Sequence, residues 1–322
     1  MSGKKIIVTG GAGFIGSNLT NALLADSRVS KVTVIDNLSN GNFQNISHHQ
    51  GNSKFEFIEE DICNYERMIE LSKGYDLISH QAALGSVPRS LKDPITSDRV
   101  NIGGTLNILH AAVLNKIDRV ILACSSSTYG DSKELPKQEG KIGSPLSPYA
   151  ITKFANELYA DVFNKSYGLN YIGLRYFNVF GPNQDANNPY AAVIPIFCQK
   201  FLENQTPTIN GEGDTSRDFT FVDNAVQANI KALFTNNESA LNQIYNVACG
   251  EQTTLNQMVD ILQRITGKDI SATHGPERAG DVKHSKADIS KIKNLLGYEV
   301  DVHFEEGLEK TYHWYQNKKN EK

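Results

Sequence analysis

The chain has 322 residues, of which 39% are hydrophobic and 21% charged, and its 32 Lys and Arg residues against 36 Asp and Glu residues give a formal net charge of −4. At about 100–200 residues per domain, this length predicts two structural units, or one large domain with an elaborated end, with enough apolar side chains for a core. The lack of a basic excess or stripe argues against nucleic-acid binding, and no apolar run reaches the roughly 18 residues that a membrane span needs.

The first half of the chain alternates short β-branched runs with longer helical patterns. We predict strands at Lys4–Val8, Val32–Ile35, Phe55–Ile58, Leu77–Ser79, Val120–Ala123 and Tyr171–Leu174. We predict helices at Phe14–Leu24, Tyr65–Leu71, Thr96–Leu114 and Tyr149–Ser166. Such alternation is typical of right-handed βαβ units, so the fold class is α/β, with a doubly wound, Rossmann-like parallel sheet.

The pattern changes after about residue 178, where prolines interrupt the chain more often. Helices are predicted at Ala192–Glu203, Asn224–Phe234, Leu255–Thr266, Ser285–Leu296 and Phe304–Asn317. We therefore expect a first domain over residues 1–178 and a smaller, mixed α/β domain over residues 179–322. The segments Asp218–Val222 and Ile244–Val247 are candidates for a return to the first sheet, so the boundary need not be a single cut.

The four cysteines show neither C-x-x-C spacing nor a zinc-finger pattern with histidines, and we expect buried free thiols in a reducing compartment. The adjacent His48 and His49 lie in a polar stretch typical of a loop, so no metal site is expected. Because the first glycine-rich motif begins at Gly10, no signal peptide fits before it, and we expect a cytoplasmic protein.

Glycines occupy a G-x-x-G-x-x-G pattern between the first strand and the first helix, at Gly10, Gly13 and Gly16. A tight strand-to-helix turn that lets a pyrophosphate approach backbone N–H groups requires glycine there, and the helix N-terminus adds positive partial charge. A turn that only permits close packing is the alternative. Asp36 follows Gly16 by 20 residues, where a carboxylate accepts hydrogen bonds from ribose hydroxyls, and Asn37 rather than Arg follows it. The motif therefore favours NAD over NADP.

The pair Asp61 and Ile62 follows the third predicted strand. Asp61 could bind the adenine amino group of a dinucleotide, or it could be the N-cap of the next helix. The residues alone favour neither interpretation.

Tyr149 and Lys153 lie four residues apart after Pro148, which suits a helix start, so both side chains share one helical face. A nearby ammonium group and a positively charged oxidised nicotinamide favour the phenolate form, which would make Tyr149 a general base for an alcohol. Ser125 comes just after the fifth predicted strand, at the sheet edge where ligands bind, and can hydrogen-bond the same substrate oxygen. A surface helix pair and a serine-rich turn are the structural alternatives.

With these residues in place, the sequence resembles the extended short-chain dehydrogenase/reductase superfamily, and within it the UDP-hexose 4-epimerases. It is most similar to bacterial UDP-N-acetylglucosamine 4-epimerases of surface-polysaccharide pathways. The stretches that carry the resemblance are His80–Ser90, Ser125–Asp131, Leu174–Gly181 and Asn210–Asp218.

The resemblance implies roles for particular residues. The catalytic triad is Ser125, Tyr149 and Lys153. The expected NAD contacts are Gly10, Gly13, Phe14, Ile15, Gly16, Asp36, Asn37, Asp61, Ile62, Gln81, Ala82, Ala83, Asn101, Tyr149, Lys153 and Tyr176. The expected UDP-sugar contacts are Ser86, Arg89, Ser126, Ser127, Asn178, Val193, Asn210, Arg217, Arg278 and Ser285. The two arginines Arg217 and Arg278 suit a diphosphate, which their planar fork can bind.

Two positions distinguish chemistries within the superfamily. Dehydratases and decarboxylating relatives carry acidic residues beside the triad hydroxyl, whereas this chain has Ser126 and Ser127, which cannot act as acid and base at neutral pH. Ser285 stands where a bulky Tyr narrows the pocket of UDP-galactose epimerases, so a small residue there leaves room for an acetamido group. Ser285 could also be the cap of the next helix.

The sequence therefore predicts an NAD-dependent 4-epimerase that interconverts UDP-N-acetylglucosamine and UDP-N-acetylgalactosamine through a transient 4-keto sugar. The alternatives are a 4-epimerase of UDP-glucose and UDP-galactose or of UDP-glucuronate, whose carboxylate Arg89 could meet, and a catalytically silent NAD-sensing protein. The resemblance also implies a homodimer through the Thr96–Leu114 and Tyr149–Ser166 helices.

Overall fold

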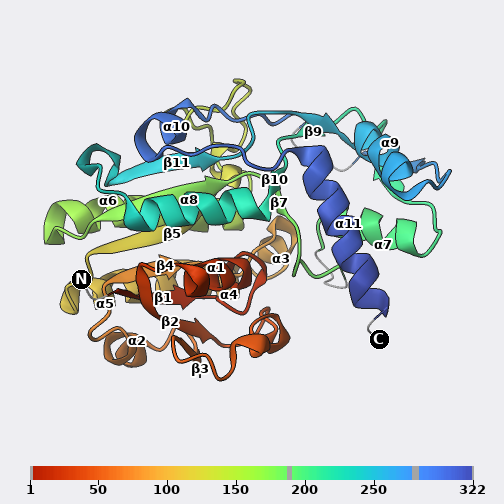
Figure 1. Ribbon diagram of the computed structural model, residues 1–322. Coiled ribbons are helices and arrows are strands. Elements are labelled where there is room, and N and C mark those ends of the chain that lie inside the picture. Colours follow the sequence, from red (N-terminus) through yellow and green to blue (C-terminus); the bar gives the residue numbers. More distant parts are fainter. Residues whose placement is uncertain (1–2, 187–190, 278–282, 321–322) are drawn as a thin grey trace.

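A seven-stranded parallel sheet forms the centre of the computed structural model, which describes residues 3–186, 191–277 and 283–320 (Figure 1). The strand order is β11-β6-β5-β4-β1-β2-β3. The bounds are β1 (Lys4–Thr9), β2 (Val29–Asp36), β3 (Phe55–Glu59), β4 (Leu77–His80), β5 (Arg119–Ser125), β6 (Tyr171–Tyr176) and β11 (Gln243–Val247). This arrangement confirms the doubly wound, Rossmann-like α/β fold.

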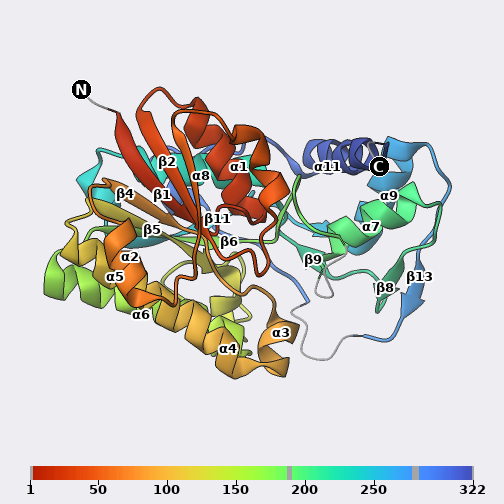
Figure 2. The same cartoon turned by 90° about the horizontal axis from the view of Figure 1, so that it is seen from below.

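Helices cover both faces of the sheet (Figure 2). One face carries α1 (Phe14–Ala25) and α8 (Val222–Phe234), and the other carries α2 (Tyr65–Leu71), α5 (Gly104–Leu114) and α6 (Pro148–Tyr167). Alternate residues of β1 point to opposite faces: Ile6 and Val8 belong to the apolar core that includes Leu19, whereas Ile7 belongs to the core that includes Leu109. The continuous apolar run of β1 is therefore buried on both sides.

The second half of the chain contributes to both parts of the molecule. Its first candidate return segment does not join the central sheet, because β10 (Thr220–Phe221) pairs with β7 (Val179–Phe180) in a separate two-stranded sheet. The second candidate lies in β11, which pairs with β6 at the sheet edge.

The remaining elements form a smaller unit beside the ends of the strands (Figure 2). They are α7 (Val193–Leu202), β8 (Thr208–Asn210), β9 (Ser216–Arg217), β12 (Thr253–Thr254), α9 (Leu255–Thr266), β13 (Thr273–Gly275) and α11 (Phe304–Asn320). Helix α10 (Ser290–Leu296) instead packs against β11 and α8 at the edge of the central sheet (Figure 1). The helix predicted from Ser285 was wrong at its start, because α10 begins at Ser290. Ser285 and Lys286 instead hydrogen-bond to other extended segments: Ser285 N donates to Ser216 O and Lys137 N to Lys286 O, at 3.0 and 2.7 Å.

The helix predicted over Thr96–Leu114 consists of three consecutive segments: α4 (Pro94–Asp98), a π-helical turn over Arg99–Gly103, and α5. The short helix α3 (Val87–Lys92) before it was not predicted. Of the four free cysteines, Cys124, Cys198 and Cys249 are buried as expected, but Cys63 is partly exposed. Among the described residues, no helix combines the length and apolar character required to cross a membrane.

A buried ion pair joins α6 to β6. Arg175 in β6 donates two hydrogen bonds to the Glu157 carboxylate, at 2.9 and 2.7 Å, and the two side chains are only 4% and 5% exposed. Arg175 also donates to Glu139 O at 3.0 Å. Since an isolated buried charge is costly, each member of this pair depends on the other.

We predict that Glu157→Gln lowers the free energy of unfolding by about 3–5 kcal/mol, because it leaves the Arg175 charge buried without its partner. Urea denaturation measures the change. The matched control is Asp161→Asn on the same helix, which removes an exposed ion pair with Lys165 and should cost only about 0.3–0.5 kcal/mol. Similar losses in both variants would show that the buried pair has no special role in stability.

Candidate functional site

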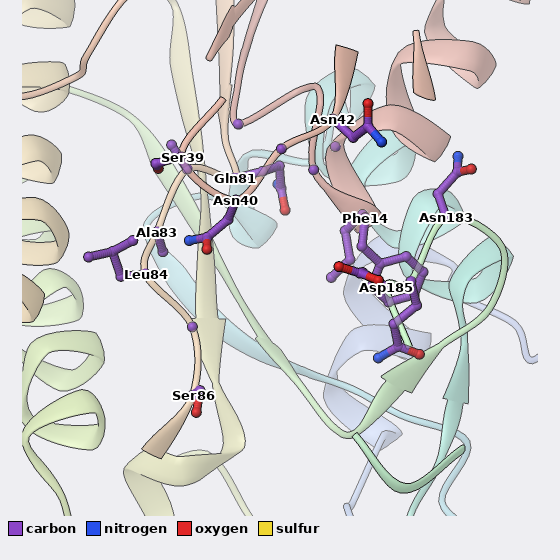
Figure 3. Close-up of a pocket in the computed structure, with 18 of the residues that line it drawn as sticks. Phe14, Ser39, Asn40, Asn42, Gln81, Ala83, Leu84, Ser86, Asn183 and Asp185 are labelled. Atoms are coloured by element: carbon purple, nitrogen blue, oxygen red, sulfur yellow. The ribbon is translucent and has the colours of Figure 1, made fainter. Parts of the chain in front are cut away.

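A cavity of about 1110 Å³ opens at the carboxyl ends of the parallel strands. Its lining includes residues at or just after the ends of five strands: Gly10 after β1, Asp36 of β2, Gln81 after β4, Ser125 of β5 and Tyr176 of β6. Because parallel strands end at the same edge, residues far apart in sequence meet there, and this is where α/β sheets bind ligands. Figure 3 shows part of the lining.

The glycine turn fits a dinucleotide. Gly10 has φ +68°, and a Cβ there would come within 2.6 Å of Ala82 N. A Cβ on Gly16 would come within 2.1 Å of Gly10 O, so the start of α1 packs directly against the turn. Gly13 is the N-cap of α1, and Gly10, Gly13, Phe14, Ile15 and Gly16 all line the cavity. The N-terminus of α1 thus presents unpaired N–H groups to an anion, as a pyrophosphate requires.

Asp36 ends β2 at the cavity wall. Its carboxylate accepts hydrogen bonds from Ala12 N at 3.0 Å and Leu38 N at 2.9 Å. Burial raises the pKa of Asp36 despite these bonds. A Cβ on Gly41 would lie 2.8 Å from its Oδ2, so the following loop closes tightly over the carboxylate. The remaining acceptor capacity of Asp36 suits a ribose diol.

Asn37, Asp61 and Ile62 lie side by side in the lining. Burial opposes ionisation of Asp61, but hydrogen bonds from Cys63 and the Asn37 side chain lower its pKa overall. The alternative in which Asp61 is the N-cap of α2 was wrong, because Asn64 occupies that position. Asp61 instead caps a local turn by accepting from Cys63 N at 2.8 Å.

A hydrogen-bond network links Gln81 and Tyr176 to each other and to Asn229, a residue of the second half of the chain. The Tyr176 hydroxyl donates to Gln81 Oε1 at 3.1 Å and accepts from Asn229 Nδ2 of α8 at 2.7 Å. Gln81 Nε2 donates to Asn229 Oδ1 at 3.0 Å and to Ser79 Oγ at 2.9 Å. This network fixes both side chains against the cavity, and burial raises the pKa of Tyr176. Asn229 carried no motif that would have revealed it from the sequence.

Ala82 and Ala83 line the cavity, whereas Asn101 does not. Asn101 is buried in the π-helical turn. Its amide accepts from Leu84 N at 2.7 Å and donates to Leu84 O at 3.2 Å and Thr152 Oγ1 at 3.1 Å. Asn101 therefore fixes the loop that presents Leu84 to the cavity (Figure 3).

The structure brings Ser125, Tyr149 and Lys153 together at the cavity. Ser147 caps α6 by accepting from Ala150 N at 3.1 Å, which places Tyr149 in the first turn with Lys153 one turn later on the same face. Tyr149 forms a side-chain hydrogen bond with Ser125. The Lys153 ammonium, nearly fully buried, donates to Ala123 O at 2.8 Å.

The electrostatics of the triad differ in part from the expectation. Burial raises the pKa of Tyr149, and the hydrogen bond with Ser125 acts in the opposite direction without reversing the shift. The lysine neighbour therefore does not by itself make the phenol more acidic than usual. Burial also lowers the pKa of Lys153 to about 8. Because this value is still above neutral pH, most of the ammonium stays protonated there.

Ser126 and Ser127 begin the 3-10 turn that follows β5, and neither lines the cavity. Ser127 donates to Ser125 Oγ both from its backbone N–H, at 3.2 Å, and from its hydroxyl, at 2.9 Å. Ser127 thus orients the Ser125 hydroxyl in this structure.

Three of the expected UDP-sugar contacts line the cavity: Ser86, Arg89 and Asn178. Arg89 Nη2 donates to Asn40 Oδ1 at 2.9 Å, on the loop that follows Asp36, so Arg89 reaches toward the cofactor side. Besides Ser126 and Ser127, the expected contacts outside the lining are Val193, Asn210, Arg217 and Ser285. Arg278 lies outside the described residues.

Two loops contribute lining residues that no motif indicated. Asn40 and Asn42 follow β2, and Asn183 and Asp185 follow β7 (Figure 3). The second loop is held on both sides: Asn183 Nδ2 donates to Ser17 Oγ at 3.1 Å, and the Tyr315 hydroxyl of α11 donates to Gln184 O. Polar loop residues of this kind do not stand out in a sequence, because asparagine and serine are common in turns.

The model of the NAD dependent epimerase/dehydratase family matches residues 6–248. The chain belongs to this family. It is 34% identical over 316 residues to a UDP-glucose 4-epimerase of Mycolicibacterium smegmatis, covering 98% of this chain and 99% of that one.

The fold is similar to those of solved structures over nearly the whole chain. A UDP-N-acetylglucosamine 4-epimerase of Methanobrevibacter ruminantium M1, in complex with UDP-N-acetylmuramic acid, is 40% identical, with a TM-score of 0.93 and coverage of 99% and 100% of the two chains. A UDP-glucuronic acid 4-epimerase of Bacillus cereus, in complex with UDP-glucuronic acid and NAD, is 33% identical, with a TM-score of 0.90 and coverage of 97% and 99%.

These findings confirm the superfamily, the enzymatic nature of the protein, NAD as its cofactor and the coarse class of UDP-sugar 4-epimerases. They set aside the alternative of a catalytically silent NAD-sensing protein. Since the named substrates of the relatives differ, the sugar of this enzyme does not follow from them.

We predict that Asp36→Asn weakens NAD binding about tenfold, because a neutral amide accepts weaker hydrogen bonds from the ribose hydroxyl groups than a carboxylate does. The variant should also prefer NAD over NADP less strongly, because the amide no longer repels a 2′-phosphate. Calorimetric titration with both dinucleotides measures this. Glu59→Gln is the matched control: Glu59 pairs in register with Asp36 at the same sheet edge but is exposed and outside the cavity lining. Unchanged NAD affinity in Asp36→Asn would contradict the assignment.

Proposed function

We propose that this enzyme interconverts UDP-N-acetylglucosamine and UDP-N-acetylgalactosamine by inversion at C4, through a transient 4-keto sugar. The observation that carries the proposal is the Ser125, Tyr149 and Lys153 constellation at the wall of a dinucleotide-sized cavity, with serines instead of carboxylates in the adjoining turn. An epimerase needs one base and room for the sugar to turn, whereas a dehydratase needs an additional acid and base. The 40% identity with a UDP-N-acetylglucosamine 4-epimerase supports the acetylated sugar.

In the proposed reaction, Tyr149 removes the proton of the C4 hydroxyl group and later returns it. Ser125 hydrogen-bonds the same oxygen, which its own contact with Tyr149 positions it to do. The Lys153 ammonium holds the nicotinamide ribose and offsets negative charge on the phenol oxygen. NAD, when bound, supplies the acceptor and donor of the C4 hydride and, in its oxidised form, a positive charge near Tyr149.

We further propose a division of labour between the two parts of the chain. Residues 1–178, with α8 and β11, bind NAD, and residues 179–322, together with Asn178 at the boundary, bind the uridine diphosphate. Asn178, Val193, Asn210, Arg217 and Arg278 are the proposed anchors of that diphosphate nucleotide, and Ser126 and Ser127 are the proposed neighbours of the hexose. An anchored nucleotide with a weakly held sugar permits the ring to present its other face.

The distinction between acetylated and other sugars rests on Ser285, which we propose leaves space for the acetamido group. The cap alternative for this residue was wrong, since α10 begins five residues later. Relatives that act on UDP-glucose and UDP-glucuronic acid make those sugars the alternatives. Arg89 gives the uronate little support, because it donates a hydrogen bond to Asn40, which lies toward the cofactor side.

We propose a cytoplasmic homodimer. Helix α6 carries an exposed apolar stripe of Ile151, Leu158 and Val162, each more than half exposed and spaced by two turns and one turn. Leu91 and Ile95 of the adjoining α3 and α4 are also exposed. The stripe on α6, one of the two helices that the family resemblance assigned to the interface, supports association through this helix.

The central test is incubation of the purified protein with UDP-N-acetylgalactosamine without added NAD, followed by chromatographic separation of the products. We expect UDP-N-acetylglucosamine to form, and turnover to fall roughly a hundredfold or more in Tyr149→Phe, because the variant lacks the base. Faster conversion of UDP-glucose or UDP-glucuronate in the same assay would favour those alternatives. A folded, NAD-loaded protein that converts none of them would refute the proposal.

We predict that Ser285→Tyr lowers kcat/KM for the acetylated sugars about tenfold or more while retaining UDP-glucose turnover, because the phenol fills the space of the acetamido group. Steady-state rates with both sugar pairs measure the change in specificity. The control is Ser290→Tyr, an exposed position at the start of α10. Equal losses with both pairs would speak against the steric role.

A further inference from the structure

Asp218 lies in the chain between β9 and β10. Its side chain is fully buried. The Oδ1 atom accepts a hydrogen bond from Cys249 N at 2.9 Å, and the Oδ2 atom accepts from Gly250 N and Ala287 N, each at 3.0 Å. One carboxylate therefore joins the segment that follows β11 to the segment that precedes α10.

The backbone of Asp218 joins two further residues. Its carbonyl accepts from Asn178 Nδ2 at 2.9 Å, and its N–H donates to Ser285 Oγ at 3.3 Å. Asn178 has φ +37°, so the amide contact holds it in a left-handed conformation that is unusual for a non-glycine residue. The neighbouring Arg217 lies immediately before Asp218 in the chain, and its Nη1 donates to Ser216 O at 3.0 Å and Lys283 O at 3.1 Å.

Three of these neighbours share one expected task. Asn178, Arg217 and Ser285 come from three separate segments, and each was assigned to the UDP-sugar. Asp218 does not line the cavity itself. We propose that Asp218 is a positioning residue that holds Asn178 and Arg217 where they bind the uridine diphosphate, and Ser285 beside the sugar, an inference that rests on the proposed function.

The chemistry of a carboxylate suits this position. An ionised carboxylate only accepts hydrogen bonds, and here three N–H groups from two segments converge on it. An amide in its place would direct an NH₂ group at one or more of these donors, which would push the segments apart. Burial raises the pKa of Asp218 to about 7, with the N–H groups of Ala287, Cys249 and Gly250 opposing the shift.

This placement predicts a selective effect. The triad and the glycine turn belong to other segments, so altering Asp218 should weaken nucleotide binding while leaving the chemical step and NAD retention nearly intact. A residue with a merely structural role would instead lower the amount of folded, NAD-loaded enzyme and leave the KM of the remainder unchanged.

The test compares Asp218→Asn with the matched control Asp223→Asn, an exposed carboxylate in the first turn of α8. Calorimetry with UDP gives the dissociation constant, and steady-state assays give kcat and KM. We expect Asp218→Asn to weaken UDP binding and raise KM by about tenfold to a hundredfold, with kcat and NAD content close to wild type. The control should match wild type in all four quantities. Unchanged UDP affinity and KM in Asp218→Asn would overturn the inference.

A second measurement on the wild-type protein applies if the variant does not fold. We expect UDP to slow hydrogen exchange at the backbone amides of Cys249, Gly250 and Ala287, because ligand binding stabilises the arrangement that those amides hold through Asp218. No added protection at these amides would overturn the inference. Because UDP is the probe, the result is independent of turnover: a protein that binds UDP in this way but converts no UDP-sugar would refute the proposed function and leave the role of Asp218 standing.

Discussion

The shared carboxyl edge of the parallel strands is the constraint on which the rest of the site depends. Parallel strands connected by right-handed crossovers all end on the same side, so the residues that follow them must converge. The glycine turn, Asp36, Gln81, Ser125 and Tyr176 meet at one cavity for this reason, although more than 160 residues separate the first from the last. The order and direction of the strands therefore determine where the cofactor side of the site lies, independently of any single side-chain contact.

Helix α6 adds charged side chains to the site that the ends of the strands alone would not provide. Tyr149, Lys153 and Glu157 follow one another at four-residue spacing on one face of this helix, and Lys153 and Glu157 are buried. Lys153 is tolerated there because Ala123 O accepts from its ammonium and Glu157 lies close enough to oppose the downward shift of its pKa. Glu157 in turn is neutralised by Arg175 of β6. The catalytic pair therefore belongs to a buried set of charges that fixes the helix against the sheet.

Sequence reasoning was most successful where backbone geometry restricts the residue. Gly10 and Gly16 could be placed because a side chain would clash, and Asp36 because strand endings coincide. Sequence reasoning failed where tertiary contacts determine the position of a residue. Ser285 belongs to an extended segment that hydrogen-bonds to Ser216 rather than to a helix, and the side-chain amide of Asn101 hydrogen-bonds to the backbone of Leu84. The direction of the Tyr149 pKa shift was also out of reach, because it depends on how completely the fold removes the phenol from water.

The substrate side is organised by a different principle. Asn178, Arg217 and Ser285 lie in or beside strands of at most two residues or in irregular segments, where no long element determines their positions. Individual hydrogen bonds to the backbone hold these segments, with Asp218 joining several of them and Asn229 linking α8 to the cofactor side. Substitutions in such segments can move a contact without disturbing the sheet, since none of the three residues belongs to a strand of the central sheet. A fold of this kind can therefore accept different sugars while its dinucleotide site and catalytic helix stay the same.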